Sequence, residues 1–241
     1  MKKILTFAAI LAVVALSLSA DIYVKSKSHT DAMSIMGQNT PAKDEVSEQW
    51  ISESALAQIG KDQGFVIDLK KNMMCIINFG AKSYVETTLP LDYAKLLPPQ
   101  MAAMAGMMTM TATVTPGNET KKIGNWNCSL YNMNLSVMGM AMPMKVWASK
   151  DVPFDTAKYV ELFANLMKGQ MRLDDASVKE FQKIKGFQIA TEMNADIMGA
   201  KMHTSSEVLE IGVKPAPAGV YEAPAGFTKK DKLSMEEIQK R

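Results

Sequence analysis

The sequence predicts an α+β protein dominated by strands, arranged as an antiparallel meander with about three helices. Two observations predict the strands. Apolar and polar residues alternate over several segments, as expected for strands that bury one face. Three of these segments end in a glycine, which tolerates the positive φ that tight hairpin turns demand. Three further segments have apolar residues at helical spacing and supply the α component.

The clearest strand spans 128–137, where Tyr131, Met133 and Leu135 alternate with polar residues. The stretch 187–197 has the same design, and a segment around Met33 repeats it weakly. Because alternate side chains of a strand point to opposite faces, each stretch should turn one face to the core. We therefore expect three hairpin ends, at Ile35-Met36-Gly37, Val137-Met138-Gly139 and Ile197-Met198-Gly199.

Other strands are expected between these hairpins. The stretch 73–79 is apolar on both parities except at Asn78, which predicts a strand covered on both faces. A strand at 109–115 should be stopped by Pro116-Gly117-Asn118. The remaining expected strands are 45–52, 64–69, 83–87, 144–149 and 202–211.

Three segments should form helices. Each has a local signal for where a helix is interrupted, begins or ends: a proline pair breaks a helix, an aspartate can cap its start, and a glycine suits the C′ position after its end. The segments are 92–108, broken by Pro98-Pro99; 155–169, starting at Asp155; and 174–185, followed by Gly186.

Two Pro-Ala-Gly turns lie near the end of the chain, and each is followed shortly by an aromatic residue, Tyr221 or Phe227. We interpret them as turns whose aromatic side chains fasten the chain end to the domain. Residues 228–241 are expected to be a flexible C-terminal tail, frayed or loosely helical.

Residues 1–20 are expected to be a signal peptide. Lys2 and Lys3 precede an apolar run, and small residues precede Asp21. The run is shorter than the roughly 20 residues that a membrane-spanning helix needs. We therefore expect an exported protein, periplasmic or secreted, with no transmembrane segment in the mature chain and a single domain over 21–227.

The expected mature chain is electrically balanced. Without the two lysines of the leader it holds 25 basic and 25 acidic residues. That balance favours neither nucleic acid nor an anionic membrane surface as a partner, and we expect no nucleic-acid partner.

The two cysteines leave two alternatives open. In an oxidising compartment Cys75 and Cys128 could form a disulfide. They could equally be two buried free thiols. Their spacing excludes a CxxC redox site.

The residues give little support for catalysis. Only His29 and His203 could carry protons near neutral pH. The chain has no GxSxG, HExxH or glycine-rich phosphate loop. His203 falls in an expected strand with Ser205 and Glu207 on the same face, which is typical of a solvated strand face. We therefore expect a protein that is not an enzyme and has no cofactor.

The chain has 21 methionines, and their role is the main clue to its function. Closely spaced thioethers are soft ligands that suit Cu(I). Methionine also fills irregular cores and lines surfaces that accept varied shapes. A stripe at 101–108 has helical spacing, and a second group alternates from 138 to 144. The candidate lining residues are Met101, Met104, Met107 and Met108 on the helix, with Met138 and Met140 at a hairpin tip.

Four segments resemble an exported bacterial family known as domain of unknown function 4412. They are DIYVKSKSHTDAMSIMGQNTPAKDE, IGNWNCSLYNMNLSVMG, KVWASKD and PAPAGVYEAPAGF. This family is similar in form to periplasmic lipoprotein carriers of the LolA and LolB type. The resemblance implies a strongly curved antiparallel sheet, an unclosed half-barrel, whose concave face is covered by the helices. In such carriers acyl chains sit between the sheet and the helices.

These expectations favour a non-enzymatic periplasmic binding protein. Its ligand would be apolar, such as a lipid, an acyl chain or a lipoprotein, or else an exported partner protein. The alternative from a different class is a methionine-rich protein that binds or buffers Cu(I). The oligomeric state is left open by the sequence.

Overall fold

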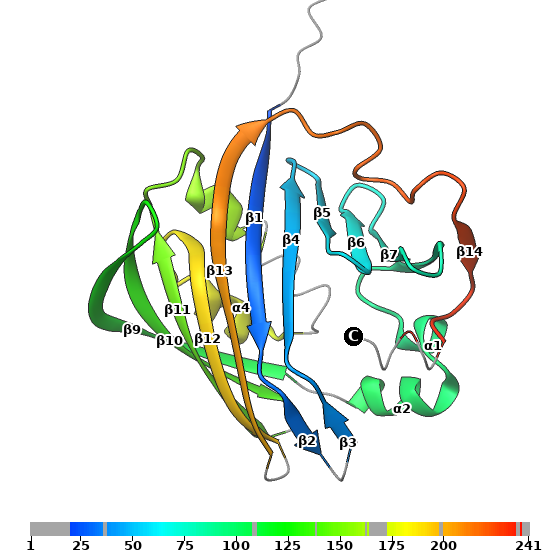
Figure 1. Cartoon of the computed structure of the whole chain (residues 1–241), viewed down its shortest axis with the longest axis horizontal. Helices are drawn as coiled ribbons and strands as arrows, with labels where there is room; N and C mark the ends of the chain where they lie inside the picture. The colour runs from blue at the N-terminus through cyan, green and yellow to red at the C-terminus, as the bar shows by residue number, and fades with distance from the viewer. Residues whose placement is uncertain are drawn as a thin grey trace, which may run out of the picture.

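One large, unclosed sheet dominates the protein (Figure 1). The structure, a computed structural model, describes residues 20–35, 38–107, 110–137, 139–161, 163, 173–197, 200–234 and 237. Twelve strands lie in the order β14-β8-β7-β6-β5-β4-β1-β13-β12-β11-β10-β9, and all neighbours are antiparallel except β14 and β8. The expected strand-rich α+β class with a large antiparallel sheet is therefore confirmed.

The sheet begins with β1 (Asp21–Thr30), and the bounds of its other strands follow the chain. They are β4 (Lys43–Ile51), β5 (Ala55–Ile59), β6 (Gln63–Asp68), β7 (Met73–Asn78), β8 (Ser83–Thr88), β9 (Met110–Ile123), β10 (Trp126–Val137), β11 (Met140–Ser149), β12 (Phe187–Ile197), β13 (Ala200–Lys214) and β14 (Thr228–Lys230). A separate two-stranded sheet pairs β2 (Met33–Ile35) with β3 (Gln38–Thr40).

The three expected hairpins are confirmed. β2 pairs with β3, β10 with β11, and β12 with β13. Gly139 has a φ of +82° and so supplies the left-handed conformation of the β10–β11 turn. Of the other turn residues, Met36, Gly37, Met198 and Gly199 lie outside the described residues.

The expectation for the strand after residue 109 is wrong at its end. β9 continues through Pro116 and Gly117 to Ile123. The register with β10 shifts between Ser129 and Tyr131, so the chain passes the proline with a local irregularity. β9 is also the edge strand of the sheet. An edge strand tolerates proline because its outward N–H groups have no neighbouring strand.

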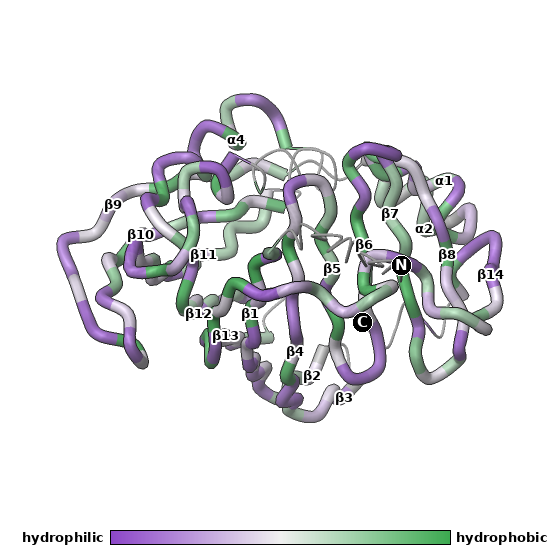
Figure 2. The backbone as a smooth tube through the Cα atoms, turned by 90° about the horizontal axis from the view of Figure 1, so that it is seen from above, coloured by the Kyte–Doolittle hydropathy of each residue, from purple (hydrophilic) through white to green (hydrophobic). Residues whose placement is uncertain are grey.

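The helices are short and lie on one side of β1, β4 and β13 (Figure 2). The proline break is confirmed: α1 (Tyr93–Leu96) is followed by α2 (Pro99–Met107), which packs against α1. Residues 156–161 and 163 are also helical. α4 (Asp175–Phe181) is capped by the side chain of Asp174, which accepts the N–H of Ser177.

The inner face of the sheet, on the helix side, carries the core. Paired positions extend one apolar row across five strands, from β1 to β7. Side chains of α1 and of the segment 152–163 pack against this half of the sheet, whereas α4 packs on β9, β10 and β11. The row consists of Ile22, Ile51, Leu56, Ile67 and Met74.

The outer face is covered over part of its area by the chain after β13. Tyr23, Trp50 and Val66 are buried there, beneath Tyr221 and Phe227. The expected role of the two Pro-Ala-Gly turns is therefore confirmed. β7 contributes Ile76 to the inner core and Ile77 to the outer cluster, so it is covered on both faces as expected.

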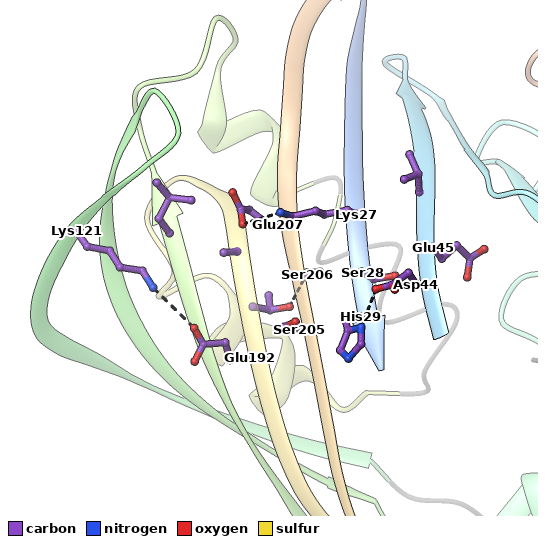
Figure 3. Close-up of a pocket in the computed structure, with 14 residues that line it drawn as sticks. Lys27, Ser28, His29, Asp44, Glu45, Lys121, Glu192, Ser205, Ser206 and Glu207 are labelled. Carbon is purple, nitrogen blue, oxygen red and sulfur yellow. Dashed lines mark hydrogen bonds and ion pairs between the residues drawn. The ribbon is translucent and has the colours of Figure 1, made fainter. Parts of the chain in front are cut away.

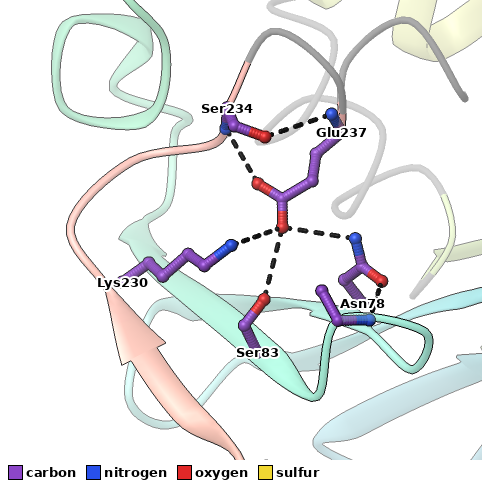
Figure 4. A network of polar contacts seen from close by, with 6 residues as sticks. Asn78, Ser83, Lys230, Ser234 and Glu237 are labelled. Carbon is purple, nitrogen blue, oxygen red and sulfur yellow. Dashed lines mark hydrogen bonds and ion pairs between the residues drawn. The ribbon is translucent and has the colours of Figure 1, made fainter.

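Part of the segment expected to be a flexible tail is instead attached to the sheet. β14 pairs in parallel with β8, and Leu233 is buried in the inner core. Glu237 is also buried, and its carboxylate accepts hydrogen bonds from Asn78, Ser83 and Lys230 (Figure 4). The chain thus passes from the outer face, along the edge of β8, to the inner face.

Burial alone would raise the pKa of Glu237, but its polar partners outweigh that effect. The backbone N–H of Ser234, the ammonium of Lys230 and the hydroxyl of Ser234 stabilise the carboxylate and lower the pKa to about 2. The ionised form of Glu237 therefore favours the attached conformation of the chain end.

We predict that Glu237→Gln lowers the free energy of unfolding by about 2 kcal/mol at neutral pH, because charge-assisted hydrogen bonds are lost. The folded pKa lies below the ordinary value of 4.5, so this stabilisation is present above pH 4.5 and is lost toward pH 2. Urea unfolding followed by circular dichroism at several pH values measures both effects. Glu119→Gln on the exposed part of β9 is the matched control. Equal stability of wild type and Glu237→Gln at neutral pH would contradict the prediction.

Candidate functional site

A wall of methionines covers the inner face of the strands at one wing of the sheet. The register decides which residues share this face: Met144 pairs with Met133 on β10 and with Met193 on β12. Met133 and Met144 both pack in the cluster beneath α4, which fixes this face as the inner one. The methionines of this methionine wall are Met110, Met133, Met140, Met142, Met144, Met193 and Met202.

Burial falls along the methionine wall toward the β10–β11 turn. Met133 is 5% exposed, and Met142 and Met144 are half-buried. Met140, the first residue of β11, is 45% exposed and is one of the few large apolar side chains of the described chain with such exposure. The wall therefore begins in packed core and ends in contact with solvent, as the mouth of a binding surface would.

Of the six candidate lining residues, the structure describes the side chains of two. Met101 lies on α2 and is half-buried, and Met140 is exposed near a hairpin tip. Met104 and Met107 are on α2, but their side chains lie outside what the structure describes, as do Met108 and Met138 entirely. The wall itself comes mainly from strand residues, which cross-strand pairing brings together from distant parts of the sequence.

α4 holds the outermost strand of this wing in place. The hydroxyl of Ser177 accepts the N–H of Ala112 at 3.0 Å, and the carboxylate of Glu180 accepts the N–H of Val114 at 2.8 Å. Because β9 is the edge strand, no further strand is available to accept hydrogen bonds from these N–H groups. Side chains of α4 thus replace a missing strand and fix the edge of the methionine wall.

A polar stripe adjoins the methionine wall on the same inner face. Met193 on β12 pairs with Thr204 on β13, which pairs with Thr30 on β1. Cross-strand hydroxyl contacts recur along the stripe and join Ser26 to Ser47, Thr30 to Thr204, and Thr191 to Ser206, at 3.2, 3.4 and 2.7 Å. We call this the hydroxyl stripe: Ser26, Ser28, Thr30, Ser47, Thr191, Thr204 and Ser206, all half-buried.

A hollow lies on the outer face of the sheet (Figure 3). Lys121 on β9 lies 3.8 Å from Glu192 on β12, and its ammonium is 4.0 Å from the ring centroid of Trp147. β10 and β11 separate β9 from β12 in the sheet, so the end of the β9–β10 hairpin must curl over the outer face. The curled hairpin and the outer face border a partly open cavity of about 610 Å³, which we call the outer cavity.

The charged groups of this outer cavity are paired with one another. Lys27 lies 3.5 Å from Glu207. His29 contacts Asp44 at 2.7 Å and Asp31 at 3.0 Å, and hydrogen bonding to these carboxylates raises its pKa. Because each cation already faces an anion, the outer cavity offers a solvated polar surface with little net charge. Within the described residues, no group of three or more His, Cys, Asp and Glu side chains could hold a metal ion.

The cysteines are free thiols in the structure. Cys128 on β10 and Cys75 on β7 are separated by seven strands in the order of the sheet. Burial raises the pKa of Cys75 to about 11 and raises that of Cys128. Both thiols therefore stay protonated near neutral pH and are poor nucleophiles.

Comparison with known proteins adds no assignment. No model of a known protein family matches the chain, and no curated protein sequence matches it significantly. The resemblance in the four segments therefore stays a prediction. No helix among the described residues is long and apolar enough to cross a membrane.

We predict that the protein carries two alkylatable thiols. Iodoacetamide under denaturing, non-reducing conditions should add two carbamidomethyl groups, because the strands that carry Cys75 and Cys128 lie far apart in the sheet. Intact-protein mass spectrometry counts the groups. A protein that takes up the label only after reduction contains a disulfide and would contradict this arrangement.

Proposed function

We propose that the protein is a non-enzymatic binding protein that holds an apolar chain, such as the acyl chain of a lipid, against its methionine wall. The single observation that carries the proposal is the gathering of seven methionines on one face of five neighbouring strands, from buried Met133 to exposed Met140. The expected export and the resemblance to lipoprotein carriers of the half-barrel type support it.

The chemistry of methionine fits this role. Its side chain is unbranched and polarizable, so a methionine surface can repack around ligands of different shape. Half-buried Met142, Met144 and Met193 would each bury more apolar area on contact with an acyl chain. Burial of apolar area is favourable by about 25 cal/mol per Å². The burial of these side chains therefore adds to the burial of the acyl chain itself in favouring the complex.

Copper binding is the competing function, and one observation favours it. Met133, Met144 and Met193 occupy one paired row on three adjacent strands, which brings three thioethers close together. Three thioethers are a ligand set that suits Cu(I). Against it, Met133 is 5% exposed within packed core and would have to leave its contacts to reach a metal. We therefore place apolar binding first.

The test uses the mature protein and the neutral fluorescent probe N-phenyl-1-naphthylamine. We predict saturable binding, and about tenfold weaker binding by Met142→Gln/Met193→Gln, because the polar amides reduce the apolar area of the wall. Fluorescence titration gives the affinity, and circular dichroism checks that both proteins are folded. Leu209→Gln is the matched control, since Leu209 on β13 is 45% exposed and lies outside the wall.

Two outcomes would contradict the proposal. One is the absence of saturable probe binding by the folded wild-type protein. The other is an equal loss of affinity in Leu209→Gln and in the wall variant. A parallel titration with Cu(I) against a chromophoric chelator tests the competing function, which requires tight metal binding that Met144→Leu abolishes.

A further inference from the structure

We propose that the ligand is an uncharged amphiphile, an acyl chain with a hydroxyl-bearing neutral head such as a monoacylglycerol, whose head lies on the hydroxyl stripe. This inference rests on the proposed function of the methionine wall. It adds the chemical class of the ligand and the direction in which the ligand lies across the sheet.

The wall and the stripe are continuous. In one paired row, Met133, Met144 and Met193 are followed directly by Thr204 and Thr30. The row runs over β10, β11, β12, β13 and β1, so its ends are roughly 19 Å apart at about 4.8 Å per strand. An extended acyl chain laid along this row would meet thioethers first and hydroxyl groups at its end.

The hydroxyl groups can serve a neutral polar head. A serine or threonine hydroxyl has one donor and two acceptor sites, so a single cross-strand contact leaves capacity for a ligand. Thr204 and Ser206 are half-buried rather than enclosed, and Ser28 lies between Ser206 and Glu45 in the next pairings. Adjacent hydroxyls on β12, β13 and β1 therefore offer several donors and acceptors within a small area.

The charges beside the stripe disfavour an anionic head. Glu45 pairs with Ser28, and its carboxylate lies 3.1 Å from the ammonium of Lys43. Lys43 is the only cation that the described paired rows place at the end of the stripe, and this partner already satisfies it. A carboxylate or phosphate on the stripe would lose hydration next to Glu45 without gaining an unpaired cation. A neutral head loses less hydration there and can still form hydrogen bonds.

A small inner pocket next to the stripe is consistent with a head of limited size. It has a volume of about 210 Å³ and is lined by Ser28, Ser47 and Gln58 on its polar side and by Phe65 and Ile76 on its apolar side. Gly60, Gly64 and Glu45 line it as well. Polar and apolar groups thus meet at the place where the chain and the head of an amphiphile would join.

The test compares monolauroylglycerol with laurate as competitors for N-phenyl-1-naphthylamine at pH 7.5, where laurate is ionised. We expect monolauroylglycerol to bind at least tenfold more tightly than laurate. Thr204→Val/Ser206→Ala keeps the shape of the stripe but removes two hydroxyls, and should reduce this preference about fivefold. Ser205→Ala is the matched control, because Ser205 lies between them in sequence but pairs with His29 and Glu192 and therefore faces the other side of the sheet.

The outcomes separate this inference from the proposed function. Equal or tighter binding of laurate, or an unchanged preference in Thr204→Val/Ser206→Ala, would overturn the neutral-head inference while fluorescent-probe binding still supports the wall. The same loss of preference in Ser205→Ala would also overturn it. If neither the probe nor either lauroyl compound binds the folded protein, the proposed function fails and the inference fails with it.

Discussion

The register of the antiparallel sheet is the constraint on which the rest of the molecule depends. A shift of one residue in any strand would exchange its inner and outer side chains. Met144 would then lie on the outer face, and Lys145 would face the core beneath α4. The methionine wall, the hydroxyl stripe and the paired charges of the outer cavity therefore all follow from the same set of hydrogen-bonded pairs.

That constraint explains what could be predicted from the sequence. Alternation identified the strand 128–137 and its core residues Tyr131, Met133 and Leu135, because the pattern is local. Alternation also predicted the return strand at 144–149, but β11 begins four residues earlier, at Met140. Alternation could not show that Met144 pairs with Met193, because the two residues are 49 positions apart in the sequence and α4 lies between them. The methionine wall forms only when distant strands pair, so no short stretch of the sequence could predict it.

The misjudged end of β9 has a related physical reason. Pro116 and Gly117 would interrupt a central strand, where both edges need hydrogen-bond partners. β9 is an edge strand, and α4 satisfies Ala112 and Val114 on its free side. The chain can therefore pass the proline, shift register and curl toward the outer face, where Lys121 reaches Trp147. The order of strands in the sheet decides whether a strand is central or at an edge. A proline or glycine in the sequence does not reveal that order.

The opposite edge of the sheet is closed by different means. β14 pairs with β8 in parallel, and buried Glu237 then holds the chain end against Asn78 and Ser83. Both edges are therefore blunted, one by a strand and one by a helix, which reduces the tendency of an unclosed sheet to pair with another molecule. An open sheet that is protected in this way can keep its inner face available without exposing unpaired strand edges.

The choice of methionine for the inner wing follows from the same argument. A wall of leucine or isoleucine has few rotamers and would either pack permanently or leave a void that costs free energy when no ligand is present. Methionine has more rotatable bonds and can cover the strands when the surface is empty and move aside when it is occupied. The gradient from buried Met133 to exposed Met140 places the least constrained side chains at the solvent end, where a ligand would enter. A surface of this kind needs no preformed cavity, because its side chains can form the cavity as the ligand binds.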